Sequence, residues 1–324
     1  MDEKKLLAVN SLTTTFKLQS GSVVSPVDHV SLTVNKGEIV GIVGESGCGK
    51  SMTAMSLIRL VPPPGKITDG EVLFDGRDVV RMSKRELAEI RGAHISTIFQ
   101  DPLTYLNPVL TIGRQIGETV QLHLGVDKKE AYRRTLEVLE MVKIPAPERV
   151  AKSYPFELSG GMRQRVLIAI AMCCNPELII ADEPTTALDV TVQAQILSLL
   201  KSLVREQGVS LVLITHDMGI VADICDRVYV MYAGQVVESG SLNKIFYESA
   251  HPYTKALLGS VLTIKERKDV IASIPGVVPD IEHFPAGCRF EPRCAMRCER
   301  CKGYKPHMTE VAPGHFAQCA LYDK

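Results

Sequence analysis

The chain has 324 residues, of which 45% are hydrophobic and 23% charged, which fits a globular protein with one large domain and a smaller one. Its 37 basic residues equal its 37 acidic residues, so binding to nucleic acid mainly through phosphate neutralisation is disfavoured. Tryptophan is absent and aromatic residues make up only 5%, which argues against stacking platforms for single-stranded nucleic acid.

Two kinds of strand are predicted along the chain. Strand-like segments near the N-terminus, separated by glycine-rich turns, predict an antiparallel layer: Leu6–Phe16, Val27–Val34 and Glu71–Phe74. Short apolar runs with helical segments between them predict buried parallel strands: Ile39–Val43, Ile95–Phe99, Leu178–Ala181, Leu211–Thr215 and Val228–Met231. The expected fold is therefore α/β, with a parallel-sheet core and an added antiparallel β layer.

A complete phosphate-loop pattern, G-x-x-x-x-G-K-[ST], follows the strand Ile39–Val43 and precedes a helix-like run, Met52–Leu60. Glycines let backbone N–H groups turn toward a polyphosphate, and the helix N-terminus adds positive potential. Lys50 is expected to reach the β- and γ-phosphates and Ser51 to ligate Mg²⁺. The predicted nucleotide-binding residues here are Gly44, Glu45, Ser46, Gly47, Cys48, Gly49, Lys50, Ser51 and Met52.

A helical insert of about residues 101–160 is predicted within the α/β core, because residues 112–123 and 129–142 have helical spacing before prolines break it. Gly208 is expected to end a later helix, Val190–Glu206. No run is apolar for long enough to span a bilayer, and the mixed-charge N-terminus does not resemble a signal peptide. A cytosolic protein, free or docked on a membrane partner, is expected.

Two carboxylates follow the strand Leu178–Ala181, at the carboxyl edge where open α/β folds bind ligands. Asp182 is expected to hold the Mg²⁺ hydration shell, and Glu183 to face the γ-phosphate and polarise the attacking water. A plain helix cap would be favoured for an isolated acidic pair, but the complete phosphate loop outweighs that interpretation.

A second helix start suited to anions is predicted at Leu158-Ser159-Gly160-Gly161-Met162-Arg163-Gln164, where Ser159 can cap and the glycines Gly160 and Gly161 expose N–H groups. This LSGG sequence, downstream of a phosphate loop and upstream of Leu178–Glu183, resembles the signature of ABC-type ATPases.

Further residues take roles that this resemblance implies. Gln100 looks like the glutamine that ligates Mg²⁺ and senses the transmembrane partner, and His216 like the switch histidine that contacts the γ-phosphate. Ala187-Leu188-Asp189 looks like the D-loop, with Asp189 crossing the dimer seam. Phe16 is assigned to stacking on adenine, although a core position explains it almost as well.

The resemblance is closer still to the ATPase subunits of dipeptide and oligopeptide importers, carried by Val61–Ile67, Phe99–Pro108 and a cysteine-rich tail. It implies ATP sandwiched between two ATPase subunits in a homo- or heterodimer, at the cytoplasmic face of the inner membrane. Two membrane permeases and an extracytoplasmic substrate-binding protein are the implied partners, and nucleic acid is not. Similar ATPases move nickel chelates or glycans, so the cargo stays open.

After residue 240 the composition changes, which predicts a nucleotide-binding domain over 1–240 and a small extension over 241–324. The extension holds five of the nine cysteines, and in a reducing compartment their density favours a metal site. Spacing alone allows zinc or an iron–sulfur cluster. The family resemblance favours a [4Fe–4S] cluster on Cys288, Cys294, Cys301 and Cys319, with Cys298 as an extra cysteine and ligation folding a tail that has little apolar core.

Two other classes fit less well. An ABC-type ATPase acting on nucleic acid or ribosomes usually carries a coiled-coil insertion or a second cassette, and neither is present in this sequence. A small-molecule kinase would leave the LSGG sequence and the D-loop unexplained.

Overall fold

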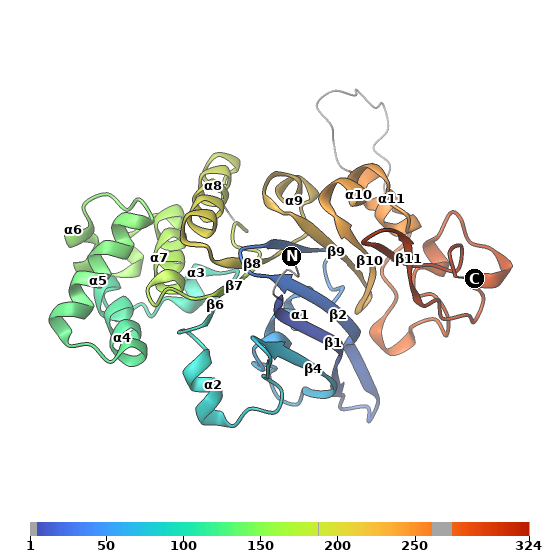
Figure 1. The fold of residues 1–324 in the computed structure, drawn as a ribbon, viewed down its shortest axis with the longest axis horizontal. Coiled ribbons are helices and arrows are strands. Elements are labelled where there is room, and N and C mark those ends of the chain that lie inside the picture. Colours follow the sequence, from blue (N-terminus) through green and yellow to red (C-terminus); the bar gives the residue numbers. More distant parts are fainter. Residues whose placement is uncertain (1–4, 187, 261–273, 324) are drawn as a thin grey trace. The chain divides into compact units, whose positions relative to one another are not determined.

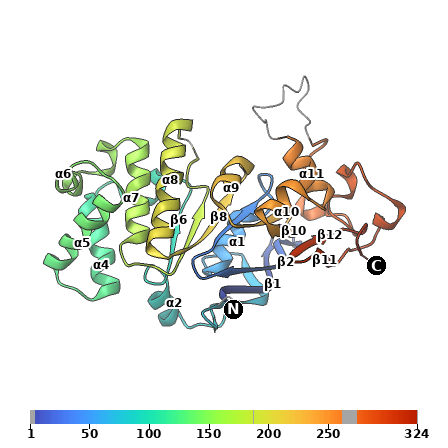
Figure 2. The ribbon, with the colours of Figure 1, turned by 45° about the horizontal axis from the view of Figure 1, so that its top comes forward.

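A computed structural model describes residues 5–186, 188–260 and 274–323 (Figures 1 and 2). These residues form two compact units. One, called the helical unit below, comprises residues 35–38 and 81–213; the other, called the P-loop unit, comprises residues 5–34, 39–80 and the described residues from 214 onward.

The helical unit is built largely from helices packed on one another, which Figure 1 shows in green. Helix α4 contacts α5, α6 and α7, and α5 also contacts α6 and α7. Their bounds are Ile112–Leu124 for α4, Lys128–Met141 for α5, Pro147–Lys152 for α6 and Gly160–Met172 for α7. The side chains of Ile116, Val120, Val138 and Leu139 are buried here, as their helical spacing predicts.

Local signals explain where these helices start and stop. The Asp127 carboxylate accepts a hydrogen bond from the Glu130 N–H at 2.8 Å and so caps α5. Gly125, at φ 66°, ends α4 in a left-handed conformation that glycine adopts without steric cost. The helices predicted over 112–123 and 129–142 are confirmed.

The remaining elements of the helical unit include short parallel strands. Strand β6 pairs with β7 in parallel, with Ile95 opposite Leu178. The bounds are Lys84–Ile90 for α2, Ile95–Ile98 for β6, Pro102–Tyr105 for α3, Pro155–Glu157 for the 3₁₀ turn η1, Leu178–Asp182 for β7, Val190–Gln207 for α8 and Ser210–Thr215 for β8, whose last two residues belong to the P-loop unit. Gly208 ends α8 as predicted, again with a left-handed φ of 65°.

The P-loop unit contains the predicted antiparallel layer, a sheet in the order β2-β1-β4-β5. Its strands are Lys5–Lys17 (β1), Val23–Asn35 (β2), Lys66–Phe74 (β4) and Arg77–Asp78 (β5). Helix α1, Lys50–Leu57, ends before the predicted Leu60 because Arg59 takes a φ of 56°, which a continuing helix does not allow.

A second group of strands in the P-loop unit runs in the order β11-β12-β10-β9-β3. Only the β3–β9 pair is parallel within this group, with Ile42 opposite Tyr229; β10 is antiparallel to both β9 and β12. The bounds are Ile39–Val43 for β3, Arg227–Tyr232 for β9, Gln235–Ser241 for β10, Met308–Ala312 for β11 and His315–Gln318 for β12. The extension therefore adds two strands to a sheet that starts beside the phosphate loop.

Short helices complete the P-loop unit. They are α9 (Met218–Ile224), α10 (Leu242–Tyr247) and α11 (Pro252–Gly259), followed in the extension by the 3₁₀ turns η2 (Ile281–His283), η3 (Glu291–Arg293) and η4 (Glu299–Cys301). Helix α10 contacts β10, and Figure 2 shows the two side by side. The domain division at residue 240 stays a prediction. Among the described residues, no helix has both the length and the apolar character needed to cross a membrane.

Candidate nucleotide site

The phosphate loop lies between β3 and α1 in the P-loop unit. Gly44, Gly47 and Gly49 all have positive φ values (157°, 78° and 99°). A Cβ at Gly49 would lie 2.1 Å from the Pro26 carbonyl oxygen, and one at Gly44 2.2 Å from that of Met231. The pattern therefore needs glycine at both positions for conformation and for space.

The side chain of Lys50 is buried, and its ammonium group stabilises the curved conformation of the phosphate loop. Lys50 Nζ donates to the carbonyl oxygens of Gly44 at 2.8 Å and Glu45 at 2.9 Å. The backbone of the phosphate loop therefore wraps around the ammonium group of Lys50. This is the arrangement from which a lysine can turn to the phosphates of a nucleotide.

Cys48 lies inside the loop, and its side chain is fully buried. Burial raises the pKa of the Cys48 thiol, although the nearby Lys50 ammonium opposes that shift. Because the thiolate is the reactive species, the raised pKa predicts that Cys48 reacts slowly with thiol reagents in the folded protein.

In the helical unit, β6 and β7 bring two predicted residues together. Gln100 Nε2 donates to Glu183 Oε2 at 3.2 Å, and the Thr186 hydroxyl donates to the same oxygen at 2.9 Å. Asp182 is buried at the end of β7. Glu183 itself has a φ of 45°, a conformation that costs a non-glycine residue about 1–3 kcal/mol. Strain of this kind is concentrated at functional positions, and it coincides here with the predicted base.

The LSGG sequence forms the exposed N-terminus of α7. Ser159 caps this helix by accepting from the Met162 N–H at 3.4 Å. A Cβ at Gly161 would lie 2.8 Å from a methyl group of Val192, so a larger residue would displace α8. Asp189, also exposed, caps α8 by accepting from the Val192 N–H at 2.9 Å. Ala187 lies outside the described residues.

Two further predicted residues, His216 and Phe16, are in the P-loop unit. His216 is exposed directly after β8, at the carboxyl end of that strand. Phe16 is half-buried in β1 and fills the space beside Gly65, where a Cβ would meet its ring at 2.4 Å. Its packing accounts for part of the ring, and the adenine-stacking role stays a prediction.

The cysteines of the extension are free thiols, and four of them line one small cavity with His251 and Phe290: Cys288, Cys294, Cys301 and Cys319. The fifth, Cys298, does not line the cavity, although its sulfur lies 3.5 Å from that of Cys301. Within residues 5–186, 188–260 and 274–323, no group of three or more His, Cys, Asp or Glu side chains has an arrangement that could hold a metal ion.

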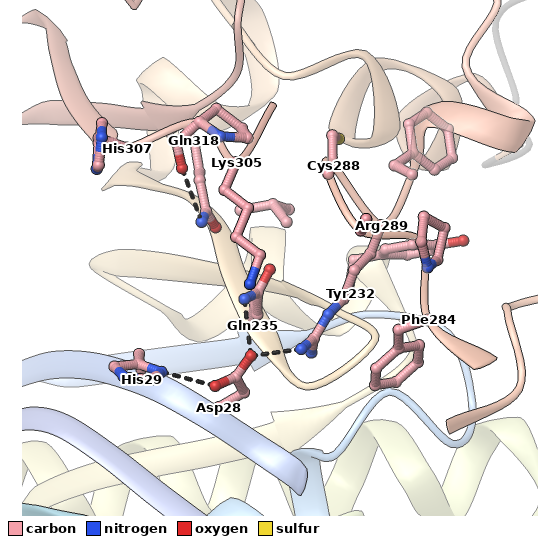
Figure 3. A pocket seen from close by; sticks show the side chains of 16 residues that line it. Asp28, His29, Tyr232, Gln235, Phe284, Cys288, Arg289, Lys305, His307 and Gln318 are labelled. Atoms are coloured by element: carbon pink, nitrogen blue, oxygen red, sulfur yellow. Dashed lines mark hydrogen bonds and ion pairs between the residues drawn. The ribbon is translucent and has the colours of Figure 1, made fainter. Parts of the chain in front are cut away.

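A larger cavity lies where the extension meets β2 and β10 (Figure 3). Arg289 crosses it, pairs with the Asp28 carboxylate of β2 and lies over the Phe284 ring. Gln235 Nε2 donates to the same carboxylate at 2.9 Å. Burial raises the pKa of Asp28, but the hydrogen bond with His29 and the positive charge of Arg289 together bring that pKa below its usual value. The contact anchors the extension within the P-loop unit.

Sequence reasoning did not identify the residues of the extension that contact the phosphate loop. Arg293 pairs with the Glu45 carboxylate at 2.7 Å, and the Tyr253 hydroxyl accepts from the Glu45 N–H at 2.9 Å. Neither residue belongs to a motif, and no local pattern links position 293 to position 45.

A phosphate loop with its lysine curled inside, a strained carboxylate after β7 and an LSGG helix start together define a P-loop ATPase of the ABC type. Residues 27–186 match the family model for "ABC transporter", and residues 237–301 match that for "Oligopeptide/dipeptide transporter, C-terminal region".

Relatives agree over nearly the whole chain. It is 49% identical to a probable peptide ABC transporter ATP-binding protein, y4tR, of Sinorhizobium fredii, covering 97% of this chain and 94% of that protein. It is 48% identical to the dipeptide transport ATP-binding protein DppD of Bacillus subtilis, covering 99% and 96%. A dimeric ATP-binding cassette, MJ0796, solved with ADP and Pi, superposes with a TM-score of 0.65 at 33% identity, over 73% of this chain and 98% of that chain. The chain belongs to the ABC transporter ATPases, within their oligopeptide/dipeptide transporter family, and its activity is ATP hydrolysis coupled to transport.

Proposed function

We propose that this chain is the ATP-hydrolysing subunit of an importer for dipeptides or oligopeptides. The observation that carries the proposal is the 48% identity to a dipeptide transport ATP-binding protein over 99% of the chain. The match of residues 237–301 to the oligopeptide/dipeptide C-terminal model supports it independently of the ATPase core. The chain would lie at the cytoplasmic face of the inner membrane. Its partners would be a second ATPase subunit, two membrane permeases and an extracytoplasmic binding protein.

The cargo is tested by transport in the complete assembly. The chain, its cognate permeases and the binding protein would be reconstituted in proteoliposomes, and ATP-dependent uptake of a labelled dipeptide measured. Competition by unlabelled peptides, with none by nickel chelates or glycans, is the expected result. Uptake of nickel or a glycan in place of peptide would overturn the peptide assignment while leaving the ATPase assignment intact.

Within the proposed mechanism, MgATP binds the phosphate loop of one subunit and the LSGG helix start of the other. Lys50 would hold the phosphates, while Ser51, Gln100 and Asp182 would hold Mg²⁺ directly or through water. The negative charge of the nucleotide would then join two positive half-sites, so closure follows binding and opening follows hydrolysis.

Glu183 would be the general base, with His216 at the γ-phosphate and Asp189 at the subunit seam. Glu183→Gln is expected to keep ATP binding, lower turnover by about 10²–10⁴-fold and trap a closed dimer on size-exclusion chromatography with ATP. Glu206→Gln, on the exposed part of α8, is the matched control and should hydrolyse ATP like the parent. Near-normal turnover of Glu183→Gln would remove Glu183 from the role of base.

The cysteine cavity is proposed to hold a [4Fe–4S] cluster on Cys288, Cys294, Cys301 and Cys319. The proposal is supported by residue type and proximity, because these four free thiols line one cavity and such clusters take four thiolates. Their side chains do not have a metal-binding arrangement in the structure, so they would have to reorient to bind the cluster. The cluster would cross-link four points of the extension, and zinc is the alternative occupant.

Metal content distinguishes the two occupants. Anaerobically purified protein should be brown and contain iron and sulfide in equal amounts. Cys294→Ser should lose them, whereas Cys298→Ser, the matched control outside the cavity, should retain them. Stoichiometric zinc in the anaerobic protein would end the cluster hypothesis.

A further inference from the structure

Glu45 is an acidic residue inside a loop that receives a polyanion. All three of its polar groups are held in the P-loop unit. Its N–H donates to the Tyr253 hydroxyl at 2.9 Å, its carbonyl oxygen accepts from Lys50 Nζ at 2.9 Å, and its carboxylate is bound by Arg293. Its backbone and side chain are therefore fixed in one conformation.

The contact with Arg293 is a two-point ion pair. Arg293 Nη1 donates to Glu45 Oε2 at 2.7 Å, and Nη2 donates to Oε1 at 3.0 Å. Parallel bonds of this kind combine charge with a defined geometry. The Arg293 side chain is only 5% exposed, so solvent screens the pair far less than it screens a surface ion pair.

Residues of the extension and of β9 hold the other side of Arg293 in place. Arg293 Nε donates to the Pro275 carbonyl oxygen at 2.8 Å, and Nη1 also donates to the Tyr232 hydroxyl at 3.3 Å. Tyr232 stacks at a tilt on Tyr253, with ring centroids 4.7 Å apart, and both rings contact Phe290. Arg293 thus cannot move without disturbing an aromatic cluster that also holds the Glu45 amide.

Charge gives this arrangement a role in nucleotide binding. An unpaired carboxylate in the loop would repel the triphosphate, and it would also be free to compete for the Lys50 ammonium. Arg293 neutralises that carboxylate and draws it toward the extension. Lys50 then meets Glu45 only at the backbone carbonyl, which leaves the loop curved around the ammonium.

We propose that Arg293 is a positioning residue for ATP binding, acting through Glu45 on the phosphate loop from within the cysteine-rich extension. The inference rests on the proposed binding of ATP at this loop. It goes beyond that function by making a residue outside every ATPase motif a determinant of nucleotide affinity.

The test is a double-mutant cycle in the full chain with its cognate assembly, read as the KM for ATP and kcat. Arg293→Ala is expected to raise the KM by about 10–100-fold while kcat changes less than about threefold. The double variant carries both Glu45→Gln and Arg293→Ala. Its KM should exceed that of the Glu45→Gln variant by less than about threefold, because no carboxylate remains at position 45 for Arg293 to neutralise. Arg297→Ala, in the same extension but with an exposed side chain 4.0 Å from its acidic partner, is the matched control and should leave the KM unchanged.

The outcomes separate the two levels of inference. An equal loss from Arg293→Ala in both backgrounds would mean that Arg293 merely supports the fold, and an unchanged KM would remove its role altogether. If the Arg293→Ala variant does not fold, Arg293→Gln replaces it in the double-mutant cycle, because glutamine keeps a long side chain with a hydrogen-bond donor but lacks the positive charge. A parent protein that binds no ATP would overturn the nucleotide site itself, whereas a parent that binds while the variants match it overturns only the role of Arg293.

Discussion

Glu238 in β10 offers a direct measure of how firmly the extension is attached. Its side chain is fully buried, and its carboxylate accepts from the Ala250 N–H at 2.6 Å and the His251 N–H at 2.9 Å. His315 Nε2, from β12, lies 2.7 Å from the same carboxylate. The perturbation is Glu238→Gln, which keeps size and shape but replaces one acceptor oxygen with a donor.

The contacts set the magnitude. The carboxamide NH₂ must face at least one of the three hydrogen-bonding groups, so one bond to a charged acceptor is lost, at about 1.5–3 kcal/mol. A buried donor left without a partner costs about 1–3 kcal/mol more. The free energy of unfolding should therefore fall by about 2.5–6 kcal/mol, which corresponds to a decrease in Tm of roughly 5–24 °C.

Urea titration followed by circular dichroism, together with calorimetry, measures this loss. The matched control is Glu310→Gln in β11, because the exposed Glu310 carboxylate accepts from the Gly314 N–H at 2.8 Å and its change should cost less than about 0.5 kcal/mol. Equal stability of the Glu238→Gln and Glu310→Gln variants would refute the reasoning, because the buried carboxylate would then contribute no more than a surface one.

Three further predictions concern the same unit. Lys50→Ala should weaken binding of a fluorescent ATP analogue by at least about 100-fold, because the loop loses its internal cation, whereas the exposed Lys17→Ala should bind normally. Cys48 should resist a thiol reagent in the native protein and react after denaturation, because burial raises the pKa of its thiol; rapid native labelling would contradict this. Burial lowers the pKa of His251 from 6.5 to about 3, so its contribution to stability is complete above pH 6.5 and is lost as pH falls toward 3, by about 1.4 kcal/mol per pH unit. Urea titrations at pH 7 and 5.5 should show this loss in the parent but not in His251→Asn, which can still cap α11.

Most of the candidate nucleotide site was predicted from short sequence motifs. The glycines, Lys50 and the helix start of the phosphate loop lie within eight consecutive residues, so their chemistry can be recognised without a fold. The same holds for the LSGG helix start and for Asp182 and Glu183 after their strand. Helix α1 was predicted too long because nothing in the apolar run to Leu60 indicates the left-handed turn at Arg59.

Contacts between residues far apart in the chain could not be predicted from the sequence. Arg293 and Glu45 are separated by 248 positions, and each residue alone is an ordinary surface type. The extension was expected to depend on metal ligation because its composition is poor in apolar residues. The structure adds strand pairing by β11 and β12, and a buried Phe290, Ala317 and His315, none of which follows from cysteine spacing.

The pairing of β12 with β10 also has a consequence for biosynthesis. Because β10 ends at Ser241 and β12 begins at His315, the whole intervening stretch must leave the ribosome before β10 acquires this neighbour. Until then β10 presents an open edge with unsatisfied main-chain groups, which is a template for association with other nascent chains. A chain truncated before His315 would therefore leave the edge of β10 open to such association and would also lack Cys319.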